Sequence, residues 1–419
     1  MRIVISTQGS LGDLLPYLGI GVELRRRGHE VVVGTAGQFR PRIEEAGLGH
    51  RPVRPHLSLG EPRWAHMLRS DNRHGLERFL AEVVAPALPD HLADTEKVLA
   101  DADLVVTHPM SLGAAIVTEL RGLPRVATVL SPWLFVSAHE PARFAGYPTV
   151  STLYTHAAWA RPLLRKAVIS RTRKSAMPII RLREGLGLSG APNPLYDGMF
   201  DADLVLGLFS SLLAEPQPDW PANTLVTGFC QDSRASAAAL PPALARFLDD
   251  GPAPAVFTLG SSYAHDPGDF YTESLAAARD CGLRAVLLAP SAVGDGLGPD
   301  VHVEPYADHR ALFPRAAAVV CSAGVGSLAA AMGSGRPFIA VPDGVDQPDN
   351  AYRCRRLGLC SALPRPRYRR RSVARLLARG LADPAFPARS ATAVAHLDAE
   401  PGVPGACDAI EELAARTVR

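Results

Sequence analysis

The segment Ala318–Ala351 alternates short apolar runs with small or polar stretches, and this alternation restricts the possible folds more than any other feature of the chain. Short apolar runs bounded by glycine or proline are typical of strands buried in a parallel sheet, and the stretches between them favour helices. The expected elements are, in order, a strand at Ala318–Cys321, a helix at Ser327–Gly333, a strand at Pro337–Val341 and a helix opening at Asp346. The segment is therefore predicted to be one βαβ unit.

Two parts of this unit could bind a ligand. Gly324 and Gly326 join the first strand to its helix and leave free backbone N–H groups at the helix N-terminus, which suits a phosphate or pyrophosphate. Asp346 and Gln347 follow the second strand, at the edge where open parallel sheets bind ligands. A carboxylate beside an amide there suits sugar hydroxyls. The alternative is an ordinary βαβ unit whose glycines serve close packing.

The same alternation runs through most of the 419 residues and predicts an α/β fold with two doubly wound domains that face a central cleft. A chain of this length normally forms more than one domain. The expected division is an N-terminal domain at 1–213, an interdomain linker region at 214–242, a C-terminal domain at 243–400 and a last helix in 401–419 that could pack back on the first domain.

The segment Ser131–Phe200 interrupts the alternation and carries a large share of the aromatic residues, Trp133 and Phe135 among them. Between Arg161 and Arg183 it has eight basic residues and no acidic one. Two interpretations are open. The segment could form solvated helices that pack over a sheet edge, or an apolar-lined lid over a bound acceptor, since loops on a rigid scaffold often carry function.

Charge and cysteine content argue against several classes of protein. The formal net charge of +2 is too small to indicate nucleic-acid binding, and six cysteines without a CxxC pair are typical of buried thiols. No apolar run reaches the about 18 residues that a membrane span needs, and the chain opens on a strand, RIVIST. We therefore expect no integral membrane segment, no signal peptide and a cytoplasmic location.

Common cofactor and metal motifs are also missing. The turn Gly9–Gly12 lacks the GxGxxG spacing of dinucleotide-binding proteins, and no lysine follows a glycine as in a P-loop. The triplets Asp101–Asp103 and Asp201–Asp203 each precede an apolar strand, where aspartates commonly end a turn. No metal site is expected.

Asp13 follows the first expected strand, Arg2–Thr7, and has two possible roles. Its carboxylate could cap the helix that it opens. At the end of a strand it could instead be a general base that takes a proton from an acceptor hydroxyl. Ser261 and Ser262 follow another expected strand and could hold a phosphate.

Five motifs, in this order and at these separations, resemble those of the nucleotide-sugar-dependent glycosyltransferases of the GT-B fold, which has two Rossmann-like domains. They are GSLGDLLP at Gly9–Pro16, RGHEV at Arg27–Val31, VFTLGSS at Val256–Ser262, LFPR at Leu312–Arg315 and DQPDNA at Asp346–Ala351. The resemblance spans most of the chain and is strongest to the branch that contains bacterial natural-product, rhamnolipid-type and sterol glucosyltransferases.

The resemblance implies an inverting, metal-independent transfer from a TDP- or UDP-linked sugar to a small apolar acceptor, as in antibiotic biosynthesis, with no other cofactor. Asp13 would be the base, and the nucleobase would lie against Tyr306. The residues expected to bind the donor are Ser261, Ser262, Tyr306, Ser322, Gly324, Gly326, Ser327, Asp346 and Gln347. Those expected in the acceptor loops are Gly9, Ser10, Gly12, Trp133 and Phe135. If the chain associates with itself, the expected assembly is a homodimer.

One departure from the family pattern falls in the phosphate turn. Family members usually have HHGGAGT or a similar run, whereas here Ser322 replaces the second histidine and Ala323 the first glycine. A serine donates a hydrogen bond without a charge, and loss of one such donor costs about 10²-fold in rate when nothing compensates. Two alternatives therefore stay open: a weak or inactive homologue that acts as a binding or auxiliary protein, and another enzyme of the fold, such as a nucleotide-sugar epimerase.

Overall fold

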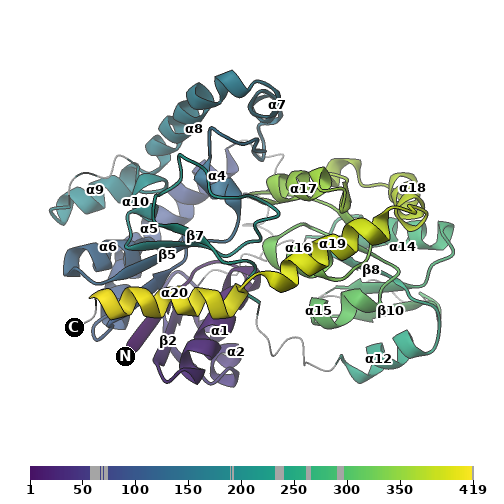
Figure 1. The fold of residues 1–419 in the computed structure, drawn as a ribbon, viewed down its shortest axis with the longest axis horizontal. Coiled ribbons are helices and arrows are strands. Elements are labelled where there is room, and N and C mark those ends of the chain that lie inside the picture. Colours follow the sequence, from purple (N-terminus) through teal and green to yellow (C-terminus); the bar gives the residue numbers. More distant parts are fainter. Residues whose placement is uncertain are drawn as a thin grey trace. The chain divides into compact units, whose positions relative to one another are not determined.

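The structure is a computed structural model that describes residues 1–56, 67, 69, 74–188, 190, 193–231, 240–260, 266–289 and 297–417. These residues form two compact units (Figure 1). Unit 1 contains the described residues from Met1 to Gln231 and those from Glu400 onward, and unit 2 contains those from Leu240 to Ala399. Each unit has its own parallel sheet with helices packed on it, as the alternation predicts.

Unit 1 is built on a seven-stranded sheet with the order β3-β2-β1-β4-β5-β6-β7. Its strands are β1 Arg2–Ser6, β2 Glu30–Thr35, β3 Gly49–Pro52, β4 Leu104–Thr107, β5 Arg125–Val129, β6 Leu204–Gly207 and β7 Thr224–Val226. Its α-helices are α1 Leu11–Arg26, α2 Arg40–Glu45, α4 Gly75–Phe79, α5 Ala85–Val98, α6 Leu112–Arg121, α7 Pro148–His156, α8 Arg161–Ser175, α9 Met177–Gly185, α10 Asp197–Phe200 and α20 Gly402–Thr417. Short 3-10 or π turns occur at Gly37–Phe39, Leu80–Val84, Pro132–Phe135 and Ala158–Ala160.

Unit 2 has a six-stranded sheet with the order β10-β9-β8-β11-β12-β13. Its strands are β8 Ala255–Thr258, β9 Ala285–Leu288, β10 Val301–Glu304, β11 Ala318–Cys321, β12 Phe338–Ala340 and β13 Cys360–Ala362. Its α-helices are α12 Pro242–Asp249, α14 Phe270–Asp280, α15 His309–Leu312, α16 Val325–Gly333, α17 Gln347–Arg356, α18 Arg370–Leu381 and α19 Phe386–Ala399, with 3-10 turns at Phe313–Arg315 and Arg365–Arg367.

Both sheets are parallel throughout, and their central strands are apolar on both faces. In unit 1 the residues Ile3, Val4 and Ile5 of β1 are all fully buried. Strands with both faces buried are what a sheet between two helical layers requires. The carboxyl ends of β1 and β4 therefore lie side by side, as do those of β11 and β12, and these two places are where the candidate residues are found.

The last helix, α20, packs along α1 in unit 1 (Figure 1). Arg27, the C-cap of α1, donates hydrogen bonds to Asp408 at 2.6 Å and to Glu411 at 2.7 Å. His29 also contacts Glu411 at 2.8 Å. These contacts tie the end of the chain to its first helix.

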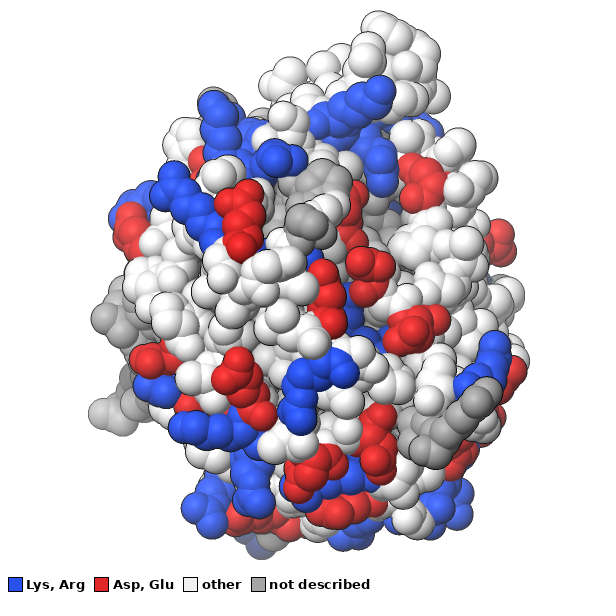
Figure 2. All heavy atoms as spheres, turned by 90° about the vertical axis from the view of Figure 1, so that its left-hand side faces the viewer, with Lys and Arg blue, Asp and Glu red and all other residues white. Residues whose placement is uncertain are grey.

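The segment Ser131–Phe200 is largely helical in this structure and contributes α7, α8, α9 and α10 to unit 1. Acidic and basic side chains mix over most of the face in Figure 2, and basic ones gather just below the uncharged side chains at its top, over α8. Within the described part of the chain there is no helix with the length and apolar character that crossing a membrane requires. All six cysteines are free thiols.

Candidate functional site

Asp13 lies in the first turn of α1, just beyond the carboxyl end of β1. Its Oδ2 accepts hydrogen bonds from the Ser10 backbone N–H at 2.6 Å and from the Ser10 hydroxyl at 2.8 Å. A carboxylate that reaches back to the N-cap N–H is stabilised there by the helix N-terminus. The Asp13 side chain keeps 29% of its surface exposed, so the carboxylate is held in place and still accessible.

The turn before α1 leaves space for this carboxylate. Gly9 has a φ of +139°, and a Cβ atom there would lie 2.4 Å from Asp13 Oδ2. Any other residue at position 9 would displace the carboxylate. Gly12 is less restricted, because the atom nearest to a Cβ at that position would be the Ser10 Oγ, at 3.4 Å. Gly9 and Ser10, which were expected to contact an acceptor, thus both shape the position of Asp13.

His108 comes from the loop after β4 and faces Asp13, a contact that the sequence did not suggest. Its Nε2 lies 3.6 Å from Asp13 Oδ1, which is beyond hydrogen-bond range but close enough for electrostatic attraction. The Met110 N–H donates to His108 Nδ1 at 3.1 Å, so in the neutral ring the proton sits on Nε2, toward Asp13. The Tyr17 ring meets the imidazole edge-on at 6.0 Å and helps to fix it.

These neighbours set the charge of Asp13. Burial raises the pKa of its carboxyl, but the contact with His108 and the hydrogen bonds from Ser10 lower it by more, so the pKa of Asp13 falls below its ordinary value. An aspartate with a lowered pKa is ionised throughout the neutral range. Asp13 is therefore ready to accept a proton.

We predict that His108→Gln shifts the acid limb of the kcat/KM profile to higher pH. His108 lowers the pKa of Asp13, so its loss raises that pKa, and Asp13 becomes protonated at a higher pH than in the natural chain. The profile of substrate turnover against pH measures this directly. His156→Gln, at an exposed position on α7, is the matched control and should leave the limb in place. An unmoved limb in His108→Gln would show that His108 does not act on Asp13.

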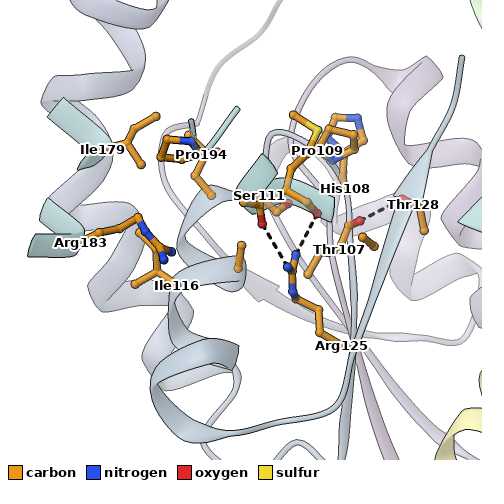
Figure 3. A pocket seen from close by; sticks show the side chains of 15 residues that line it. Thr107, His108, Pro109, Ser111, Ile116, Arg125, Thr128, Ile179, Arg183 and Pro194 are labelled. Atoms are coloured by element: carbon orange, nitrogen blue, oxygen red, sulfur yellow. Dashed lines mark hydrogen bonds between the residues drawn. The ribbon is translucent and has the colours of Figure 1, made fainter. Parts of the chain in front are cut away.

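A small cavity lies next to His108 in unit 1 (Figure 3). It encloses about 20 Å³, room for about one water molecule. Thr107 and His108 line it on one side, and Ile179 and Arg183 of α9 lie opposite. Arg125 reaches it from β5 and donates to carbonyl groups of α10. A cavity of this size does not accommodate a sugar acceptor.

Trp133 and Phe135 do not line this cavity. Phe135 is 3% exposed and stacks on Trp220 with ring centroids 4.0 Å apart, so its ring belongs to an aromatic core cluster. Trp133 is half-buried and packs against a second apolar cluster around Tyr154. In this structure the two aromatic residues expected to contact an acceptor have packing roles.

In unit 2 a turn joins β11 to α16 at the place where the sequence predicts one. Gly324 is the N-cap of α16, and the helix begins at Val325, two residues earlier than expected. Ala323 is fully buried with a φ of +64°, a conformation that costs a residue with a side chain about 1–3 kcal/mol. Strain of this kind persists only where neighbouring contacts hold it.

Asn350 of α17 supplies one of those contacts. Its Nδ2 donates to the Ala323 carbonyl at 3.1 Å and to Asp346 Oδ2 at 2.8 Å. The same amide thus links the strained turn to the acidic loop that opens α17. Gln347 is oriented as well, because its Oε1 accepts from the Asp343 N–H at 2.9 Å.

Side-chain donors converge on the N-terminus of α16. A Cβ atom on Gly324 would lie 3.8 Å from both Gln347 Nε2 and Ser322 Oγ, and one on Gly326 would meet no atom within 4 Å. Ser322 is 2% exposed, and no described residue hydrogen-bonds its hydroxyl. Ser327 differs, since its hydroxyl donates to the Gly324 carbonyl at 3.0 Å.

The remaining candidates are less closely placed. Tyr306 follows β10 and is 44% exposed. Ser261 and Ser262 lie outside the described residues.

The Asp-x-Asp triplets hold the starts of strands. Asp103 accepts a hydrogen bond from the Arg2 N–H, and Asp203 accepts one from the Arg125 N–H. Among the described residues, no three His, Cys, Asp or Glu side chains gather in a way that could hold a metal ion.

We predict that Asn350→Ala lowers the free energy of unfolding of unit 2 by about 1–3 kcal/mol, because it leaves the buried Ala323 carbonyl without its donor. Urea denaturation measures the change. The matched control is Asn223→Ala in unit 1, which removes an exposed hydrogen bond to the Ala202 carbonyl and should cost less. Equal losses in the two variants would argue against a special role for Asn350 in the turn.

Comparison with known proteins identifies the family. Residues 3–140 match the glycosyltransferase family 28 N-terminal domain. The sequence is 32% identical to O-mycaminosyltylonolide 6-deoxyallosyltransferase of Streptomyces fradiae, over 99% of this chain and 98% of that relative. This chain belongs to the GT-B glycosyltransferases. The vancomycin aglycone glucosyltransferase of Amycolatopsis orientalis is 30% identical over 86% of this glycosyltransferase and 85% of its own length.

Solved structures agree on the fold of this glycosyltransferase. The glycosyltransferase of kitacinnamycin superposes with a TM-score of 0.75 at 19% identity and covers 98% of both chains. Glycosyltransferase VinC, solved in complex with dTDP, superposes with a TM-score of 0.69 at 19% identity over 99% of this chain and all of its own. At such identities the likeness establishes the fold alone. The expected two-domain, Rossmann-like GT-B fold is confirmed.

Proposed function

We propose that this glycosyltransferase transfers a sugar from a TDP- or UDP-sugar to a hydroxyl of a small apolar natural product, with inversion at the anomeric carbon and without a metal ion. The observation that carries the proposal is the geometry of Asp13, an ionised and partly exposed carboxylate that Ser10 holds by hydrogen bonds and His108 faces at the end of a central strand. The two relatives named above are an O-mycaminosyltylonolide 6-deoxyallosyltransferase and a vancomycin aglycone glucosyltransferase, which supports a natural-product acceptor.

Unit 1 would activate the acceptor. Asp13 takes the proton of the acceptor hydroxyl while the oxygen attacks the anomeric carbon, and the bond from that carbon to the nucleotide phosphate breaks in the same displacement. The attack from the opposite face inverts the anomeric configuration. His108 would stabilise the ionised carboxylate before the transfer.

Unit 2 would bind the donor. The departing diphosphate would receive hydrogen bonds from the N-terminus of α16 and from the Ser322 hydroxyl, which has no described partner of its own. Asp346 and Gln347 would hold sugar hydroxyls, Tyr306 would lie against the base, and the neighbouring serines after β8 would contact phosphate. The open space beside Gly326 suits the approach of phosphate oxygens to the backbone.

The proposal is tested by supplying TDP- and UDP-sugars with a panel of apolar aglycones in EDTA-containing buffer. We expect release of the nucleoside diphosphate and a glycoside whose anomeric proton, seen by NMR, has the configuration opposite to that of the donor. A retained configuration would refute the single displacement. Release that requires added metal would refute the metal-independent mechanism.

We also predict that Ser322→His does not weaken binding of a nucleoside diphosphate. Ser322 lies beside Gly260, which carries no side chain, and an imidazole there could donate to the same phosphate oxygens as the hydroxyl. Calorimetric titration of both proteins with TDP and UDP measures the comparison. A clear loss of both binding and activity would show that the turn is built for a different ligand.

A further inference from the structure

Helix α8 and the turn before it have an exposed face whose composition the proposed reaction does not explain. Trp159 is 81% exposed and Leu163, one turn further on, is 66% exposed. Leu153 of α7 is 46% exposed in the same segment. Single exposed apolar residues are common on protein surfaces, but here Trp159, in the turn Ala158–Ala160, and Leu163, in the first turn of α8, are both exposed and only four residues apart.

The exposed face of α8 also carries basic residues. The helix contains six basic residues and no acidic one, and none of its residues is buried. Lys166, Arg173 and Lys174 are exposed and follow Leu163 along one face, separated by the small residues Ala167 and Ser170. Figure 2 shows uncharged side chains at the top of the molecule, over α7 and α8, with basic side chains directly below them.

The other side of α8 attaches the helix to unit 1. Leu164 and Val168 pack on the cluster around Phe144 and Tyr154. Arg161 donates to the Tyr154 carbonyl, Arg165 pairs with Asp219 at 3.5 Å, and Arg171 pairs with Glu77 at 2.8 Å. These contacts use the basic residues that face the unit. Lys166 and Lys174, in contrast, form no ion pair with a described residue.

We propose that this face, formed by Leu153, Trp159, Leu163, Lys166, Arg173 and Lys174, docks unit 1 on the surface of an anionic membrane. Tryptophan and leucine enter the boundary between headgroups and acyl chains, where tryptophan is favoured, and lysine and arginine bind the lipid phosphates. Each basic residue near an anionic leaflet strengthens binding about fivefold. The contact would be reversible and peripheral.

Two other occupants fit less well. A second copy of the chain on this face would bring one set of basic residues against the other, and the like charges would repel. A stable protein partner needs roughly 800 Å² on each side, about 20–30 residues, which is more than the exposed face of this one helix and its preceding turn offers. A lipid surface needs only a few apolar anchors and a set of cations.

The test is co-sedimentation of the whole chain with vesicles of phosphatidylcholine alone and of phosphatidylcholine mixed with phosphatidylglycerol. It involves no sugar donor, so its outcome does not depend on the proposed reaction. We expect binding to the mixed vesicles only, and weaker binding at high salt. Lys166→Gln and Lys174→Gln should each weaken it about fivefold. Trp159→Ala should also weaken it, while circular dichroism shows that each variant is folded.

Matched controls separate this face from the rest of the surface. Arg375→Gln removes an exposed charge from α18, and Leu225→Ala removes an exposed leucine from β7, and both should bind as the natural chain does. Failure to sediment with either vesicle, or binding that the α8 variants leave unchanged, would overturn the proposal. Retention on immobilised poly-L-glutamate without vesicle binding would overturn it in favour of an acidic protein partner.

Discussion

Replacing Asp13 with asparagine is expected to lower kcat for sugar transfer by about 10²–10⁴-fold, the range that a positioned general base contributes. Asparagine has the size of aspartate and can still accept the hydrogen bond from the Ser10 N–H, so the turn before α1 should keep its shape. It cannot take up the proton of an acceptor hydroxyl. The loss should therefore appear in the chemical step.

The measurement is a steady-state assay of nucleoside diphosphate release, with separate values for kcat and KM. Calorimetric binding of the nucleotide should be unchanged in Asp13→Asn, because the donor residues belong to unit 2. Asp197→Asn, at an exposed position of α10, serves as the control and should keep full activity. Turnover of Asp13→Asn at the rate of the natural chain would remove Asp13 from the mechanism.

Phe135→Ala is expected to destabilise unit 1 by about 3–5 kcal/mol, the usual cost of deleting a buried aromatic side chain. The Phe135 ring stacks between Trp220 at 4.0 Å and Phe200 at 5.2 Å, and it meets Phe209 edge-on at 6.4 Å. Alanine would leave a cavity among three aromatic rings that cannot all move in to fill it.

Urea denaturation of Phe135→Ala measures the loss, and Phe135→Leu, which retains most of the apolar volume, should lose less. This experiment also separates the two roles considered for Phe135. A core residue changes the free energy of unfolding, whereas an acceptor contact changes KM. A raised KM with unchanged stability would mean that the ring faces the acceptor and that its packing in the structure is not the functional one.

Most of the fold could be predicted from the sequence because the strands in the middle of a parallel sheet are buried on both faces and are therefore mostly apolar. The strands at Arg2–Ser6, Leu104–Thr107 and Ala318–Cys321 are of this kind, and the sequence predicts each of them. The sequence does not predict the strand Cys360–Ala362. This strand has three residues at the edge of the sheet, none of them fully buried, and so lacks the apolar pattern that marks a strand.

The site residues that belong to a local sequence motif could be predicted. The residues that reach the site only through the packing of distant segments could not. Asp13 and Ser322 sit in turns after strands, and their surroundings follow from local geometry. His108 reaches Asp13 only because β4 lies beside β1 in the sheet, although its position just after an apolar strand was a usable signal. The positions of the aromatic residues could not be predicted in this way. Phe135 is in the core and Trp159 is on the surface, and composition alone does not distinguish the two.

The central claim, that the turn between β11 and α16 binds the diphosphate of a sugar donor, is tested most directly by calorimetric titration with TDP, UDP and GDP in EDTA. We predict that TDP or UDP binds, and that Ser322→Ala weakens this binding about tenfold or more, since a hydrogen bond to a charged group contributes about 1.5–3 kcal/mol. Absence of binding by all three nucleotides, or equal binding by the natural chain and Ser322→Ala, would contradict it.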